Sequence, residues 1–183
     1  MSLVITGNPG VGKHTIADEI LKTEDYDMLD INKIAIKSNH TEKDEIGIKV
    51  DVANLKKHIK KMITKRSLIV GHLAPYVIDQ SDVEVAIILR KSPYKLVDVY
   101  EQRNYSKEKT KENLGSEILG ITAHDAISEF GSEKTFQVDT TNQIMKEITR
   151  KIHNIIKEKS SNDEVDWLSE IKQNNDLQKF FDY

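Results

Sequence analysis

The chain has 183 residues, a formal net charge of −3 and 31% charged residues. This length suits one domain with a sizeable core, and the mild negative charge gives no general attraction to nucleic acid or to anionic membranes, so we expect no specific DNA binding. There is no cysteine, which excludes disulfides and thiol chemistry, and no apolar stretch long enough to span a bilayer. We therefore expect a cytoplasmic protein without membrane insertion.

The first predicted elements are a short strand, a phosphate-binding loop and a helix. Residues 3–5 are an apolar run, and the sequence GNPGVGK follows at residues 7–13. Glycines let such a loop aim consecutive backbone N–H groups inward, where the helix N-terminus adds its positive dipole end. Lys13, first on the helix, can then reach the β- and γ-phosphates of a nucleotide. The alternative is a glycine-rich turn that binds nothing. The candidate phosphate contacts are Gly10, Val11, Gly12, Lys13, His14 and Thr15.

One position departs from the phosphate-loop consensus G-x-x-x-x-G-K-[ST]. His14 stands where a hydroxyl usually contacts Mg²⁺, and a hydroxyl follows only at Thr15. Imidazole is a poor ligand for Mg²⁺, a hard cation that prefers oxygen and keeps its waters. We therefore expect Mg²⁺ to be held mainly through water and phosphate, with Thr15 as a candidate metal-site residue.

The rest of the chain alternates predicted strands and helices. A second strand ends at Asp30, a helical run follows, and the polar stretch 38–44, continuing through Gly47, is predicted to be a mobile insertion. Asp51 is predicted to cap a helix with an apolar stripe that includes Met62. Further strands are predicted at 67–71, 83–90 and 135–139. Between and after them we expect a helix at 94–102, a longer single helix carrying Leu114, Ile118, Ile121 and Ile127, and an amphipathic helix carrying Ile144, Ile148, Ile152 and Ile155.

This alternation predicts a three-layer α/β P-loop fold, in which five parallel strands are flanked by helices. Ligands of such sheets bind beyond the carboxyl ends of the strands. Residues 159–183 form a tail with a predicted short helix and the only tryptophan, for which both a segment folded onto its own domain and a partner-binding peptide remain open. The polar residues expected at the strand ends, on the edge of the phosphate loop, are Asp30, His72, Arg90, Thr140, Thr141 and Asn142.

Several short motifs accompany the phosphate loop: GNPGVGK at 7–13, GH at 71–72, LR at 89–90, QRNYS at 102–106, EN at 112–113, EIL at 117–119 and DTTN at 139–142. In these motifs the chain resembles the P-loop nucleoside monophosphate (NMP) kinases, and within them the atypical adenylate kinase isoenzyme 6 family with its archaeal relatives. The resemblance implies an NMP-kinase domain at residues 1–158, with an NMP-binding segment at about 30–51 and a lid at about 103–113. The ending VDWL at 165–168 with KFF at 179–181 favours an archaeal source.

The resemblance implies reversible phosphoryl transfer from ATP, with Mg²⁺, to AMP, giving two ADP. Lys13, Arg103 and His72 would be the catalytic residues, with Arg103 as the lid arginine and His72 orienting the attacking group or a water. Thr141 and Asn142 would contact the adenine of ATP. The resemblance also implies an ATPase activity and a role in maturing the small ribosomal subunit beside an S11-type ribosomal protein.

Two departures from the adenylate kinase pattern keep other functions open. The NMP-binding segment holds no arginine, so Lys33 or Lys37 would have to grip the AMP phosphate, and no acid ends the third strand, so Asp30 would take the outer magnesium role. These gaps favour an ATP-driven assembly factor in which kinase activity is incidental, whereas Arg103 favours the kinase. A P-loop kinase for another small acceptor is the third reading.

Overall fold

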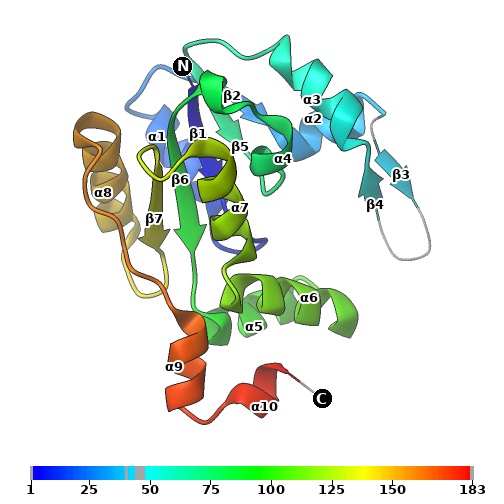
Figure 1. The fold of residues 1–183 in the computed structure, drawn as a ribbon, viewed down its shortest axis with the longest axis vertical. Coiled ribbons are helices and arrows are strands. Elements are labelled where there is room, and N and C mark those ends of the chain that lie inside the picture. Colours follow the sequence, from blue (N-terminus) through cyan, green and yellow to red (C-terminus); the bar gives the residue numbers. More distant parts are fainter. Residues whose placement is uncertain (1, 40, 44–47, 182–183) are drawn as a thin grey trace.

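The computed structural model describes residues 2–39, 41–43 and 48–181, and its centre is a parallel sheet of five strands in the order β2-β5-β1-β6-β7 (Figure 1). The strands alternate with helices along the chain, and β1 is hydrogen-bonded in parallel to both β5 and β6. The predicted five-stranded parallel sheet is confirmed. The strands are β1 Ser2–Thr6, β2 Asp27–Asp30, β5 Ser67–Val70, β6 Val83–Arg90 and β7 Thr135–Asp139.

Helices cover both faces of this sheet, and the central strands β1, β5 and β6 are buried along almost their whole length. On one face, α1 (Lys13–Leu21) packs against α8 (Met145–Glu158). On the other, α3 (Val52–Lys60), α4 (Ala74–Val77) and α7 (Ile121–Phe130) pack in succession over β1 and β6. Two apolar clusters result, one on each side of the sheet. No helix among the described residues is long and apolar enough to cross a membrane.

The acceptor-side insertion differs in part from its prediction. After β2, Asp30 caps helix α2 (Ile31–Lys37), and a two-stranded antiparallel hairpin follows, formed by β3 (Thr41–Lys43) and β4 (Ile48–Val50). The predicted mobile insertion therefore contains paired strands of three residues each, too short to give a clear alternation pattern in the sequence. The remaining part of that prediction, residues 40 and 44–47, lies outside the described residues.

The predicted single helix around residue 118 is wrong, because two helices occupy this segment. Helix α6 (Lys107–Ile118) ends before Gly120, whose φ of 65° is left-handed and starts a new direction for α7. Two apolar assignments also fail: Met62 lies beyond the end of α3 and is 39% exposed, and Ile144 precedes α8 and is 63% exposed. Asp51 caps α3 as predicted, since its side chain accepts the N–H of Asn54.

The segment after α8 first covers the open edge of β7 and then joins the core. The side chain of Asn162 accepts the N–H of Gln137, and the N–H of Asp163 donates to the carbonyl of Gln137. Two short helices follow, α9 (Trp167–Gln173) and α10 (Leu177–Phe180), rather than the one predicted. They lie below the carboxyl ends of the strands, next to α5 (Pro93–Gln102) and α6 (Figure 1).

Candidate phosphate-binding site

The loop between β1 and α1 has the backbone of a tight anion cradle. Gly7 has a φ of 132°, and a Cβ at this position would lie 2.4 Å from the carbonyl oxygen of Leu89 in β6. Gly12 has a φ of 102° at the N-cap of α1, with open space where its side chain would be. Only glycine fits the first position without shifting β6, so the sheet holds the loop closely over the strand ends.

Lys13 lies inside this loop, where its ammonium is turned onto the backbone. The Nζ atom donates to the carbonyl oxygens of Gly7 and Asn8, each at 2.8 Å, and the residue is 8% exposed. Burial, and next the positive charge of Arg103, lower the pKa of Lys13 to about 8. The lysine is therefore preorganised at the loop by two weak, uncharged acceptors, which an incoming anion can replace.

Two further cations approach from the other side of the site. Arg103 is exposed in the turn between α5 and α6, and its charge contributes to the lowered pKa of Lys13. Lys109 on α6 has its Nζ 4.0 Å from the ring centroid of Tyr105, and its charge contributes to the lowered pKa of His72. The charge of Arg103 thus acts on the predicted Lys13, and that of Lys109 on the predicted His72, so an anion bound at the loop would offset this positive charge.

His72 stands just beyond the end of β5, facing the same cations. Burial, followed by the positive charges of Lys13 and Lys109, lowers the pKa of His72 to about 4. The imidazole is therefore neutral at physiological pH, with one nitrogen that donates and one that accepts. In that state it is suited to orient a hydroxyl or a water, and it adds no positive charge to the site.

His14 and Asp30 form a contact that the sequence analysis did not foresee. The Nε2 atom of His14 lies 2.8 Å from Oδ2 of Asp30, while Oδ1 of Asp30 accepts the N–H of Lys33 at 3.1 Å. Although burial raises the pKa of Asp30, these hydrogen bonds hold it below its usual value. The carboxylate is ionised and joins the first turn of α1 to the start of α2. The hydroxyl of Thr15 is exposed and makes no hydrogen bond to the residues that the structure describes.

The loop after β7 lies directly beside the phosphate loop. Thr140 donates from Oγ1 to the carbonyl of Val11 at 3.1 Å, and Thr141 Oγ1 accepts the N–H of Ser92. Asn142 is exposed next to them. The structure therefore brings the predicted adenine-contact residues alongside the loop, with the side chain of Thr141 already engaged and that of Asn142 open to solvent.

Arg90 belongs to a buried network that the sequence analysis missed. Its guanidinium donates to Glu117 Oε1 at 2.8 Å and to the carbonyl oxygen of the same residue at 2.8 Å, and it is 3% exposed. Asn8 of the loop donates to Glu117 Oε2 at 2.7 Å. Glu117 lies among the apolar residues Leu114 and Ile118 on one face of α6, and this charge within an apolar stripe was the one available signal.

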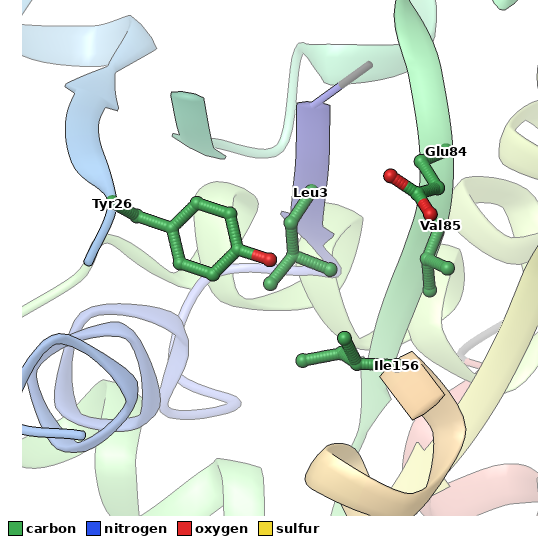
Figure 2. Close-up of a pocket in the computed structure, with 5 residues that line it drawn as sticks. All are labelled: Leu3, Tyr26, Glu84, Val85 and Ile156. Carbon is green, nitrogen blue, oxygen red and sulfur yellow. The ribbon is translucent and has the colours of Figure 1, made fainter. Parts of the chain in front are cut away.

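The pocket drawn in Figure 2 lies at the opposite end of the strands. Tyr26, before β2, points its ring toward Leu3 of β1, and Glu84 of β6 lies near the two. Burial, then the charges of Glu24 and Glu84, raise the pKa of Tyr26. This pocket holds none of the candidate residues. Within the described ranges, no group of three or more His, Asp or Glu side chains is placed to hold a metal ion.

Comparisons with known proteins agree on one protein family. A family profile described as an AAA domain matches residues 3–120. "Putative adenylate kinase" from Pyrococcus abyssi is 31% identical over 158 residues, covering 86% of this chain and 84% of that protein. A protein of the same name from Methanococcus maripaludis is 32% identical over 160 residues, covering 83% of this chain and 86% of its own length.

Two solved structures share the fold. Deoxyadenosine kinase from M. mycoides superposes with a TM-score of 0.57 at 19% identity, over 86% of this chain and 99% of its own. Shikimate kinase from Bacteroides thetaiotaomicron gives a TM-score of 0.58 at 12% identity, over 86% and 98%. At these identities the likeness concerns the fold alone.

Proposed function

The chain belongs to the P-loop family described as an AAA domain and, within it, to the archaeal adenylate kinase-like nucleoside monophosphate kinases; from this premise we propose that it transfers the γ-phosphoryl group of ATP to AMP. In this reaction an α-phosphate oxygen of AMP bonds to the γ-phosphorus as the bond to the β-γ bridging oxygen breaks, and two ADP result. The reverse transfer uses the same site.

The lysine buried in the glycine loop, held there by two backbone carbonyls, carries the proposal. Lys13 is buried in the glycine loop, and the charges of Arg103 and Lys109 act on Lys13 and His72 respectively. A phosphoryl group in transfer needs positioning and neutralisation of charge more than covalent help from the protein. Lys13 would hold the ATP phosphates, and Arg103 would close on the transferring group from the turn between α5 and α6.

On the acceptor side, the proposal places AMP near α2. Lys33 has its Nζ 3.5 Å from Asp30 Oδ2, and Lys37 lies one turn further along the helix and is exposed. Either ammonium can meet the AMP phosphate as a point charge, with less directional grip than an arginine. His72, neutral at physiological pH, would orient the attacking oxygen through a hydrogen bond.

The residues present also fit Mg²⁺ bound through its waters. Asp30 supplies an ionised, buried carboxylate beside the loop, and Thr15 supplies an exposed hydroxyl on the first turn of α1. Hard oxygen donors suit this cation, which retains several waters. When bound with ATP, Mg²⁺ supplies charge neutralisation at the β- and γ-phosphates. His14 contacts Asp30 instead, which leaves the imidazole outside the metal's ligand set.

The test of this proposal is a product analysis of purified protein with Mg-ATP, with and without AMP, separated by ion-exchange chromatography. We expect ADP to form only when AMP is present, two molecules for each ATP consumed, with no free phosphate. Other nucleoside monophosphates, added in place of AMP, should support slower ADP formation. If one of them reacted faster than AMP, that nucleotide would be the preferred acceptor, and the reaction class would stay the same.

The same experiment tests a second candidate, an ATPase that serves the assembly of a partner. The absence of arginine from the acceptor segment, residues 30–51, favours this reading. Its signature would be phosphate release at a rate indifferent to AMP. The S11-type ribosomal protein implied by the resemblance stays a prediction, and its addition to the reaction would show whether it changes that rate.

Nucleotide binding should take up a proton above pH 8. In the free protein most Lys13 side chains are neutral at about pH 8.5, because burial and Arg103 lower the pKa to about 8. Phosphates beside the lysine favour its charged form and raise that pKa. Titration calorimetry with a non-hydrolysable ATP analogue, in two buffers of different ionisation enthalpy, should show a fractional proton uptake at this pH, limited by the share of Lys13 that is neutral before binding. A Lys13→Arg variant stays charged, so uptake equal to that of the native protein would contradict the assignment.

A further inference from the structure

The segment after residue 158 is built into the domain rather than laid on its surface. Ile171 of α9 is fully buried, Phe180 of α10 is 4% exposed, and both belong to the core cluster under α1 and α8. The hydroxyl of Tyr94, on α5, donates to Asp176 at 2.7 Å, and its ring meets that of Phe180 edge to face with centroids 5.1 Å apart. The tail therefore contacts the helices on both sides of the turn that carries Arg103.

Trp167, the only tryptophan, makes the deepest polar contact of this segment. Its indole Nε1 donates to Glu117 Oε1 at 2.9 Å, inside the domain. The same oxygen accepts Arg90 Nε at 2.8 Å and the N–H of Lys91 at 3.2 Å. Glu117 is fully buried. A buried carboxylate with this many donors has a fixed position, because each lost donor would leave part of its charge unsatisfied.

Glu117 is in turn hydrogen-bonded to a residue of the phosphate loop. Its second oxygen accepts Asn8 Nδ2 at 2.7 Å, while Asn8 Oδ1 accepts the hydroxyls of Ser116 and Thr122 at 3.0 and 3.1 Å. The amide of Asn8 is thus satisfied on both ends and cannot turn. The backbone oxygen of Asn8 is one of the two acceptors of Lys13 Nζ. Three consecutive contacts, of 2.9, 2.7 and 2.8 Å, join the indole of Trp167 to the lysine.

We propose that Trp167 is a positioning residue for the phosphate loop, acting through Glu117 and Asn8, so that the C-terminal segment sets the affinity for ATP. The proposal rests on the proposed function only in that the loop binds the ATP phosphates. When Lys13 turns from the Asn8 carbonyl to a phosphate, the loop end of the network changes. By linkage, a tail that affects ATP binding is itself affected by ATP.

Matched variants separate positioning from general stability. Trp167→Phe keeps an aromatic ring but deletes the donor to Glu117, while Tyr94→Phe deletes the hydrogen bonds of its hydroxyl with Asp176 and Asn174 in the tail, which do not reach the loop. We expect Trp167→Phe to weaken binding of a non-hydrolysable ATP analogue about five- to tenfold. This loss of affinity corresponds to part of the free energy that a hydrogen bond to a charged group contributes. The KM for ATP should rise in parallel, and the KM for the acceptor should stay unchanged. Tyr94→Phe should change ATP binding by less than about twofold, although both variants lose a similar amount of thermal stability.

A second measurement needs no substitution. Since the native protein holds one tryptophan, fluorescence excited at the long-wavelength edge of protein absorption reports on Trp167 alone. Saturation with the ATP analogue should shift this emission, and Tyr94→Phe should show the same shift. The proposal is overturned if the emission is unchanged at a saturation verified by calorimetry, or if Trp167→Phe binds and turns over ATP as Tyr94→Phe does. Should Trp167→Phe fail to fold, the emission alone decides. If the native protein bound no ATP analogue at all, the proposed function would fail first and this inference with it.

Discussion

Replacing Lys13 with alanine is expected to lower nucleotide turnover by at least about 10²–10³-fold, the typical loss when one preorganised charge-stabilising group is removed from a transition state. Lys13 is the one cation buried in the described part of the phosphate loop, and Arg103 and Lys109 approach from a helix turn and helix away from it. The measurement is the rate of ADP formation at saturating Mg-ATP and AMP.

The control for this prediction is Lys22→Ala, which removes an exposed lysine at the end of the same helix, paired there only with Glu19. This variant should keep the native rate. Because Lys13→Ala also leaves the carbonyls of Gly7 and Asn8 without their donor, its folding should be checked by circular dichroism, and Lys13→Met offers a second variant with a similar stem. A folded Lys13→Ala protein with native turnover would refute the phosphate-loop assignment.

Replacing Glu117 with alanine is expected to cost about 3–5 kcal/mol of folding stability, since it leaves a buried charge without its partner. The unpaired group is Arg90, which is 3% exposed, and the donors of Asn8 and Trp167 lose their acceptor with it. For a domain of this size the loss corresponds to a fall in melting temperature of roughly 10 °C or more. Denaturant unfolding, followed by circular dichroism, measures the change directly.

Two control variants separate the loss of the buried network from a general effect of substituting a glutamate. Glu112→Ala, at an exposed position on the same helix α6, should change stability by less than about 0.5 kcal/mol. Glu117→Gln keeps one acceptor oxygen but no charge and should fall between the two. If Glu117→Ala were as stable as Glu112→Ala, the network around Arg90 would have no energetic importance.

The elements that the sequence predicts well are those whose signal is local. Strands β1, β5 and β6 are mainly apolar runs, because a strand covered on both faces of a parallel sheet needs apolar side chains on both of its sides, whereas β2 and β7 also carry polar residues. Asp51 caps α3 by a local contact, in which its side chain accepts the N–H of Asn54 three residues later. The hairpin β3–β4 was missed because each of its strands has only three residues, too few for a clear alternation pattern. The division between α6 and α7 was missed because it depends on the left-handed φ of Gly120.

The parts of the candidate site that escaped prediction depend on contacts between distant residues. Asn8 and Glu117 are 109 positions apart in sequence, and Trp167 and Glu117 are 50 apart. No local pattern encodes which buried polar group will satisfy which, so Arg90 was expected only as a polar residue at a strand end, and its partner Glu117 had no assigned role. The contact of His14 with Asp30 likewise became visible only once β2 and α1 were placed side by side.

The hydrogen bonds from Asn162 and Asp163 to the edge of β7 have a consequence for synthesis of the chain. Strand β7 emerges more than twenty residues before the segment that covers it, so a nascent chain presents an unpaired strand edge for some time. Exposed edges of this kind recruit other strands and lead to aggregates. A chain shortened before residue 160 would keep that edge open permanently, and we expect it to accumulate in the insoluble fraction during overproduction.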